Sequence, residues 1–235
     1  MSSTVGHVRG RVPRWLSGRY TGLTIVLLIL SVSSIAIGQT DLRKVIDGVA
    51  FSVLLVLAIR IVGQRLRVAT VALVVPTLIS HWIDHLSDSL VHRIVGLGLA
   101  TVFLVFLTLV IMFAVFRDET VTFDTIFGAV CAYLLLGVTW GTAYALLVVI
   151  SPDSLSVSPG LAHASGWGEP ISAFTPVLQY YSFTTLATTL GYGDVSPLSP
   201  GARALSVMEG LAGQLYLAVL VARLVGIHTA RALKP

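Results

Sequence analysis

The sequence predicts an all-α membrane protein with six transmembrane helices and a shorter re-entrant helix between the fifth and the sixth. The 235-residue chain is 55% hydrophobic and 11% charged, with a mean hydropathy of +0.91, whereas an average soluble domain is about 25% charged. Long apolar segments alternate with short polar ones, and one apolar stretch between the last two segments is too short to cross a bilayer. This pattern is typical of a protein solvated by lipid.

Six apolar segments have the length of a span, which needs about 20 helical residues. The third is short and contains Pro76, so we expect it to be kinked or tilted. The first follows a basic stretch, but its apolar run is longer than the about 7–15 residues of a signal peptide, so we expect it to stay uncleaved. The segments are 20–38, 45–63, 68–83, 94–116, 123–150 and 203–227.

Lysine and arginine, which favour the cytoplasmic side of a membrane, are unevenly distributed. With a cytoplasmic N-terminus, eleven of the 15 lie on the inner side and four on the outer side. We therefore expect a multi-pass protein of the cell membrane, with both termini cytoplasmic and the loop after the fifth span outside. The inner residues are Arg9, Arg11, Arg14, Arg19, Arg60, Arg65, Arg67, Arg117, Arg223, Arg231 and Lys234, and the outer residues are Arg43, Lys44, Arg93 and Arg203.

A glycine-containing run, 188–194 (TTLGYGD), lies between the last two spans. Glycines at alternate positions permit backbone angles closed to other residues, so that successive carbonyl groups can face one axis. A row of carbonyl oxygens can replace the hydration shell of a cation. Thr175 and Pro176 form a helix-start signal, which predicts a short helix from Pro176 to about Ala187 leading into the run.

The run resembles the selectivity filter of the tetrameric potassium-channel superfamily of pore-loop cation channels, with Leu190 where valine is usual. The likeness is specific over about residues 180–226 and architectural over residues 20–150. The chain thus looks like a six-span, bacterial-type member without a charged fourth helix. Because one filter loop supplies a quarter of such a pore, the resemblance implies a homotetramer in the lipid bilayer.

The resemblance also implies roles for the residues of the run. Their carbonyl oxygens, with the Thr189 hydroxyl at the inner end, would bind K⁺ as the permeant ion, and no cofactor is expected. The Tyr192 ring would point away from the pore, and Asp194 would tie the filter to the structure behind it. The expected K⁺ ligands are Thr189, Leu190, Gly191 and Tyr192, with Gly193 completing the outer mouth.

The expected support behind the filter departs from the family pattern. Tyr181 and Ser182 stand near the places of a tryptophan pair, and Thr185 stands where some members carry glutamate. Glu209 is the one carboxylate away from the ends of an apolar span, where burying a charge is costly. It either accepts hydrogen bonds from Thr184, Thr185 or Tyr181 and supports the filter, or it faces an outer water-filled crevice.

The sixth span is the expected inner helix. Gly213 follows Asp194 by nineteen residues, where family members often have a glycine at which this helix bends. Gly213 serves either as a gating hinge or as a small residue that permits close helix packing. Gln214, Leu217 and Val221 share one face at helical spacing and are expected to line the inner cavity.

The first four spans suggest a structural collar rather than a voltage sensor. The fourth contains no lysine or arginine, so steep voltage gating, which needs charges that move through the field, is not expected. His81, His85, Asp88 and His92 recur at intervals of four, three and four, which on one helix would place them on one face. Such a stripe either binds zinc or senses external protons, or it is the polar face of an interfacial helix.

We expect four parts along the chain, with an irregular turret at 151–172 because this stretch is rich in serine, proline and glycine. We expect no cytoplasmic ligand-binding domain in the last part. The parts are a basic cytoplasmic N-terminus at 1–19, a four-helix transmembrane domain in the voltage-sensor position at 20–119, a pore domain at 120–230, and a cytoplasmic tail at 231–235.

The sequence therefore predicts a potassium-selective channel subunit that conducts K⁺ passively and is not an enzyme. Two alternatives stay open: a weakly selective Na⁺/K⁺ channel, in which Leu190 loosens the filter, and a non-conducting subunit that modulates another channel. The single loop disfavours a transporter with four pore loops in one chain. Nucleic-acid binding is not expected, because the basic residues lie at segment ends, and the single cysteine, Cys131, excludes an intrachain disulfide.

Overall fold

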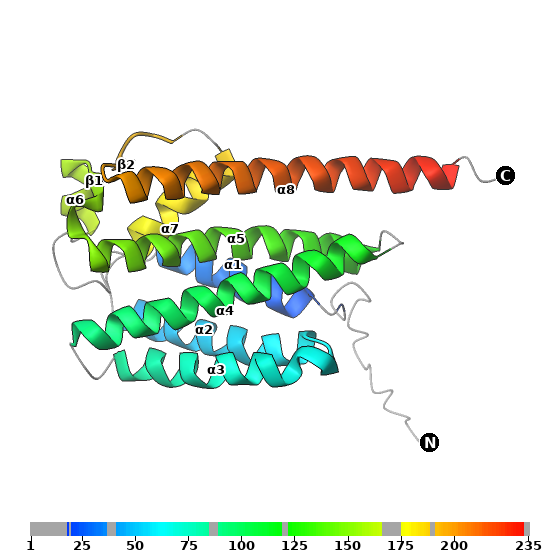
Figure 1. Cartoon of the computed structure of the whole chain (residues 1–235), viewed down its shortest axis with the longest axis horizontal. Helices are drawn as coiled ribbons and strands as arrows, with labels where there is room; N and C mark the ends of the chain where they lie inside the picture. Colours follow the sequence, from blue (N-terminus) through cyan, green and yellow to red (C-terminus); the bar gives the residue numbers. More distant parts are fainter. Residues whose placement is uncertain are drawn as a thin grey trace, which may run out of the picture.

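The computed structural model describes residues 18, 20–36, 41–84, 89–118, 122–165, 175–188 and 191–232. Each long helix runs antiparallel to the long helix before it, so that α1 begins and α8 ends at the same end of the bundle (Figure 1). The long helices are α1 (Thr21–Ala36), α2 (Asp41–Ile61), α3 (Gln64–Asp84), α4 (Leu90–Arg117), α5 (Phe123–Ile150) and α8 (Pro200–Ala232).

Among the described residues, four helices are long and apolar enough to cross a membrane. They fit the prediction of an all-α membrane protein, and they account for four of its six expected spans. α1 contributes a shorter apolar stretch, Thr21–Ser33, and Pro76 lies inside α3 without ending it. The four are Gln64–Ile83, Leu90–Arg117, Phe123–Ile150 and Pro200–Ile227.

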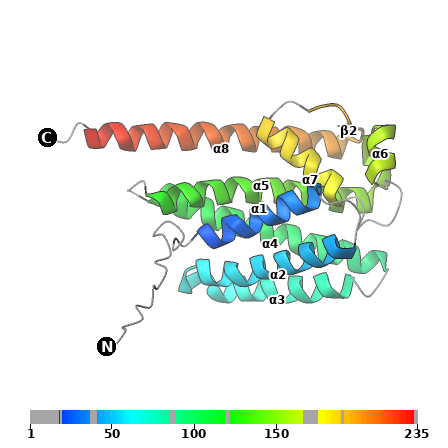
Figure 2. The ribbon, with the colours of Figure 1, turned by 180° about the vertical axis from the view of Figure 1, so that it is seen from behind.

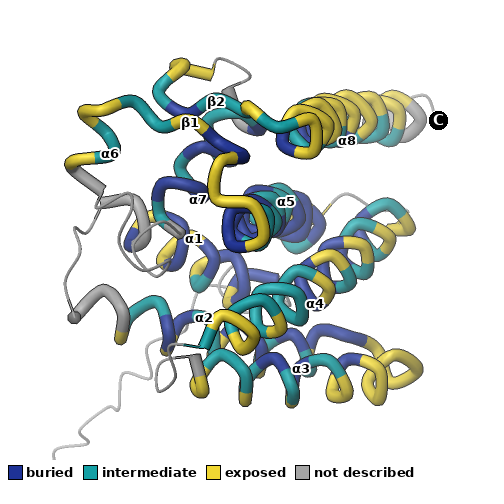
Figure 3. The backbone as a smooth tube through the Cα atoms, turned by 60° about the vertical axis from the view of Figure 1, so that its left-hand side comes forward, coloured by how far each residue is buried: buried dark blue, intermediate teal, exposed yellow. Residues whose placement is uncertain are grey.

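One hydrophobic core extends through most of the bundle. Leu23 of α1, Leu54 of α2, Leu107 of α4 and Leu135 of α5 are fully buried in it, and Tyr216 of α8 joins them. The core therefore continues across the expected boundary between the four-helix and pore domains. α8 itself lies at the edge of the bundle and is largely exposed (Figure 3): 11% of its apolar stretch is buried, against 56% of that of α5.

The loop between α5 and α8 is more regular than the expected turret. Its two strands pair in antiparallel register, with Leu155 opposite Pro197, and bury Leu155 and Val195. The expectation of an irregular stretch is wrong here, because the pairing joins residues that are distant in the chain and carry no repeated local pattern. The loop contains a 3₁₀ turn at Pro152–Ser154, β1 at Leu155–Val157, α6 at Pro159–Ser165, α7 at Thr175–Phe183 and β2 at Val195–Pro197.

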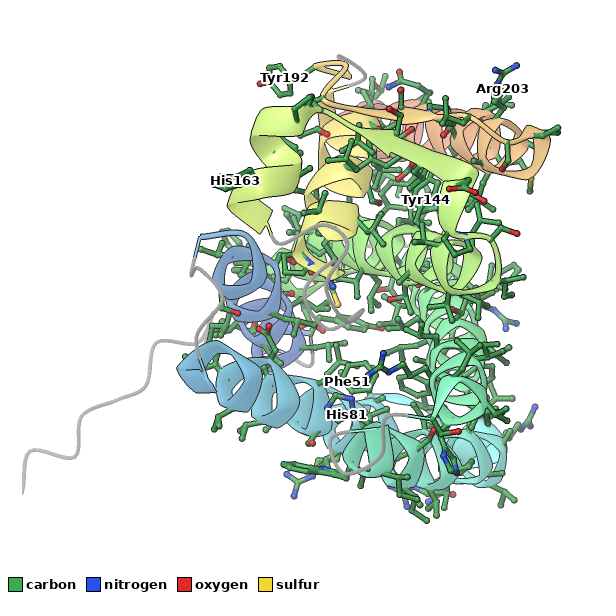
Figure 4. The ribbon with its side chains drawn as sticks, turned by 90° about the vertical axis from the view of Figure 1, so that its left-hand side faces the viewer. Phe51, His81, Tyr144, His163, Tyr192 and Arg203 are labelled. Atoms are coloured by element: carbon green, nitrogen blue, oxygen red, sulfur yellow. The ribbon has the colours of Figure 1, made fainter. Side chains whose placement is uncertain are left out.

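The expected stripe of histidine and aspartate does not lie on one helix. α3 ends and α4 begins between His81 and His92, so these two residues stand on consecutive antiparallel helices. His81 lies against Phe51 of α2, with ring centroids 4.9 Å apart (Figure 4). His85 and Asp88 fall outside the described residues. Within the described part of the chain, no group of three or more metal-ligating side chains is found, and zinc or proton sensing stays a prediction.

Candidate functional site

The segment from α7 to β2 enters the bundle and returns to the same end. α7 slants from α1 toward α8 (Figure 2) and continues in a π-helical turn at Thr184–Thr188. The chain then turns back, and β2 pairs with β1 near the start of α8 (Figure 1). This helix occupies the place of the short helix expected from Pro176 to about Ala187.

α7 and its π-helical turn pack against glycine residues of α5 and α8. A Cβ atom on Gly137 of α5 would lie 2.3 Å from Cε1 of Phe183, and one on Gly213 of α8 would lie 2.7 Å from Cδ1 of Leu186. Carbon atoms in contact are normally about 3.5–4.0 Å apart. The structure therefore gives Gly213 the close-packing role, and α8 continues through it without a break. Bending at Gly213 stays a prediction.

Hydroxyl groups of α5 and α7 connect the two helices. Tyr133 of α5 donates a hydrogen bond of 3.0 Å to the carbonyl of Leu186, and Ser182 lies 2.9 Å from the carbonyl of Gly137. Leu186 is in the last turn before the run, where helical carbonyl groups lack partners within the helix. The Tyr133 bond therefore fixes the end of the segment that leads into the run.

Glu209 of α8 is fully buried behind α7 rather than open to a water-filled crevice. Its Oε2 accepts a hydrogen bond of 2.7 Å from the Tyr144 hydroxyl, and its Oε1 lies 2.6 Å from the Ser182 hydroxyl. Tyr144 was detectable in the sequence as a polar group inside an apolar span, since such a group needs a partner there. Its pairing with Glu209 was not detectable, because 65 residues separate them.

The expected donors to Glu209 are wrong. The Tyr181 hydroxyl lies 2.8 Å from Ser206 instead, and Thr184 donates to the carbonyl of Tyr181 at 2.9 Å. The Thr185 hydroxyl has no hydrogen-bond partner among the residues that the structure describes. Thr184 and Thr185 lie in the π-helical turn, which takes more residues per turn than an α-helix, so their side chains do not follow α-helical spacing. Support of the filter by Thr185 and Glu209 stays a prediction.

The two glycines of the run adopt left-handed backbone angles, with φ of 52° at Gly191 and 78° at Gly193. Residues with a side chain rarely occupy this region. Tyr192, between them, is 65% exposed and projects away from the bundle (Figure 4). Thr189 and Leu190 lie outside the described residues, so coordination of K⁺ by the whole run stays a prediction.

Asp194 is connected to the structure behind the run. Its carboxylate accepts hydrogen bonds from the Tyr180 hydroxyl of α7 and, at 3.0 Å, from the Val195 amide. Its carbonyl accepts a bond of 2.7 Å from the Ser158 amide. The aromatic partner of Asp194 is thus Tyr180, the residue before the two that stand near the places of the tryptophan pair.

We expect Tyr180→Phe to fold normally and to shorten the time for which ion flux is sustained. Losing this partly exposed hydrogen bond costs about 1 kcal/mol per subunit, a factor of about five in the equilibrium that holds Asp194 in place. The measurement is the rate at which flux from liposomes declines. Asp194→Asn and the double variant of Tyr180→Phe with Asp194→Asn complete a double-mutant cycle. Additive effects of the two changes would show that the bond between Tyr180 and Asp194 does not sustain the flux.

The expected cavity residues differ in their surroundings. Gln214 and Val221 are exposed in the single chain, whereas Leu217 packs against the hydrophobic core. Lining of a cavity by this face therefore stays a prediction. The charge pattern included Arg223 of α8 but not its contact: its guanidinium donates to the carbonyls of Val115 and Asp118 at the end of α4.

We expect Arg223→Gln to lower the thermal stability of the protein. Hydrogen bonds from a cation to the unpaired carbonyls of a helix end are favourable, and their loss at this partly exposed place costs about 1–2 kcal/mol. Arg203→Gln on the same helix is the control, because Arg203 makes one long bond of 3.5 Å to Pro197; its effect stays within about 0.5 kcal/mol. Equal melting temperatures of the two variants contradict the assignment.

A comparison with protein families matches residues 101–229 to the family described as ion channel. The matched part extends from within α4 to the end of α8 and includes α7, the run and β2. No curated protein and no solved structure matches the chain. The family match covers more than half of the sequence and contains Tyr133, Tyr144, Tyr180, Ser182 and Glu209, whose contacts are described above. The chain belongs to the ion channel family.

Proposed function

We propose that this protein is a subunit of a homotetrameric, potassium-selective channel that conducts K⁺ passively and is not an enzyme. The observation that carries the proposal is the pair of left-handed glycines, Gly191 and Gly193, directly after a short helix packed between α5 and α8. In this proposal α7 is the re-entrant pore helix, and the carbonyls of 189–192 replace the water around K⁺.

A tetramer accounts for surface that a single chain leaves exposed. Gly191, Tyr192 and Gly193 are exposed, and nothing lies within 4 Å of a Cβ built on either glycine. On α8, Val207, Leu211 and Leu215 are 62%, 57% and 61% exposed. Four copies around one axis would bring four runs together and place the inner helices around a common path.

The remaining features support a six-span channel of the cell membrane with cytoplasmic termini. α4 carries Arg93 in its first turns and Arg117 at its end, with no basic residue between them. Charges that move through the field are the basis of voltage gating, so the first four helices are not a voltage sensor of the usual kind. The basic residues Arg60, Arg65 and Arg117 gather at the end of the bundle where α8 ends, which favours this end as the cytoplasmic one.

Ion flux from liposomes that contain only the purified protein tests the proposal. We expect K⁺ and Rb⁺ to pass, Na⁺ to be excluded and barium to block, as carbonyl coordination of a dehydrated ion requires. Equal passage of Na⁺ and K⁺ would favour the weakly selective alternative. Absence of all flux would favour a modulatory subunit, and cross-linking in the membrane tests the tetramer separately.

A further inference from the structure

A continuous series of hydroxyl and carboxyl groups crosses the interface of α5, α7 and α8. It begins at a tyrosine of α7, passes through two residues of α8, one of α5 and a serine of α7, and ends at a backbone carbonyl of α5. The contacts are Tyr181 to Ser206 at 2.8 Å, Ser206 to Tyr144 at 3.1 Å, Tyr144 to Glu209 at 2.7 Å, Glu209 to Ser182 at 2.6 Å, and Ser182 to the carbonyl of Gly137 at 2.9 Å.

The carboxyl group in this series is enclosed by neutral partners. Glu209, Tyr144 and Ser182 each have 0% exposure. The ionisable groups nearby are the phenols of Tyr144 on α5 and Tyr181 on α7, and among the described residues Glu209 has no basic partner. A carboxylate charge here would lie in a buried place without a compensating cation, which is unfavourable.

The number of hydrogen atoms decides which form of Glu209 completes the series. Ser182 has one hydroxyl hydrogen but contacts two oxygen atoms, one of Glu209 and one of Gly137. If Glu209 is charged, both of these are acceptors, and Ser182 can serve only one. If Glu209 is neutral, its own hydrogen bonds to Ser182, and Ser182 donates to Gly137.

The same reasoning holds for the whole series. With a charged Glu209 the two tyrosines and two serines supply four hydrogens for five contacts. With a neutral Glu209 there are five hydrogens for five contacts, and each donates in the same direction, from Tyr181 toward Gly137. Buried polar groups are rarely left without a hydrogen-bond partner, so the neutral form fits these contacts.

We propose that Glu209 is a neutral carboxylic acid that donates its proton to Ser182, and that this series holds α7 in place between α5 and α8. Glu209 is thereby a positioning residue: it acts on the run through α7 and does not contact the permeant ion. The effect on conduction rests on the proposed channel function, whereas the protonation of Glu209 does not.

Substitutions separate the neutral form from a charged one. The side chain of Glu209→Gln is neutral and of the same shape, and its amide can donate to Ser182 and accept from Tyr144. We expect this variant to conduct within about twofold of the natural protein. Glu209→Leu removes the acceptor of the Tyr144 hydroxyl and the donor to Ser182, which interrupts the series at its centre, and we expect it to reduce flux at least about tenfold.

Infrared absorption of the full-length protein in lipid, at neutral pH, tests protonation directly. The difference between the natural protein and Glu209→Gln should show the carbonyl band of a protonated carboxylic acid. Asp153→Asn, at an exposed aspartate, is the control and should show loss of carboxylate bands. Loss of carboxylate bands in Glu209→Gln overturns the proposal, as does a Gln variant that fails to fold or is as impaired as Glu209→Leu. If the natural protein passes no K⁺, the proposed function fails while the infrared result stands.

Discussion

Gly191→Ala and Gly193→Ala are each expected to abolish selective K⁺ conduction. Both positions have positive φ angles, where a residue with a Cβ atom is destabilised by about 1–2 kcal/mol. In a homotetramer the change occurs four times around one axis. Relief of this strain would rotate the adjoining peptide groups and turn their carbonyls away from the ion, so we expect the loss in conduction to exceed the loss in stability.

The measurement is the ratio of K⁺ to Na⁺ flux from liposomes, with the melting temperature measured in parallel. Gly98→Ala is the matched control: it lies in α4, has no positive φ, and has nothing within 4 Å of a built Cβ. It should conduct normally and be stabilised by up to about 1 kcal/mol, since alanine favours helix over glycine. Retained selectivity in Gly191→Ala and Gly193→Ala would show that the run is not the K⁺ filter.

The long helices could be predicted because lipid allows few alternatives. A backbone that crosses an apolar layer must satisfy its own hydrogen bonds, so apolar length alone located α5 at Phe123–Ile150 and α4 to within a few residues. The β1–β2 pair could not be found in this way, since 37 residues separate its strands. The prediction that His81 and His92 share one helix face was wrong for a related reason. Spacing along the chain places residues on one face only if a single helix contains them, and here α3 ends and α4 begins between the two.

The candidate site was predictable in its location but not in its contacts. The glycine-containing run could be located from the sequence, because glycine is the residue that most readily adopts a positive φ angle. The groups that surround it depend on how α7 is rotated between α5 and α8, and this rotation is set by contacts between residues far apart in the chain, such as Tyr144 with Glu209 and Ser182 with Gly137. Tyr180 contacts Asp194 and Ser182 contacts Glu209, whereas Thr184, Thr185 or Tyr181 were the expected donors to Glu209.

Gly137→Ala is expected to destabilise the protein although it adds only one methyl group. The added Cβ would lie 2.3, 2.6 and 2.7 Å from three ring carbons of Phe183, so the rigid ring would have to move by about 1 Å to reach a normal contact distance. α5 and α7 must separate, which also stretches the contact of Ser182 with the Gly137 carbonyl. Overpacking of this kind costs about 1–3 kcal/mol, measured as a lower melting temperature and a reduced flux.

Gly22→Ala in α1 provides the comparison, because nothing lies within 4 Å of a Cβ built there; it should not be destabilised. A second change tests the cause. Phe183→Leu removes ring atoms that the new methyl group meets, so the double variant Gly137→Ala with Phe183→Leu should recover stability that the two single changes lose together. Additive losses would mean that the contact between α5 and α7 is not the source of the effect. Recovery would show that α7 is positioned by the absence of a side chain on α5, because the hydrogen bonds from Tyr133 and Ser182 act only over the short distance that Gly137 permits.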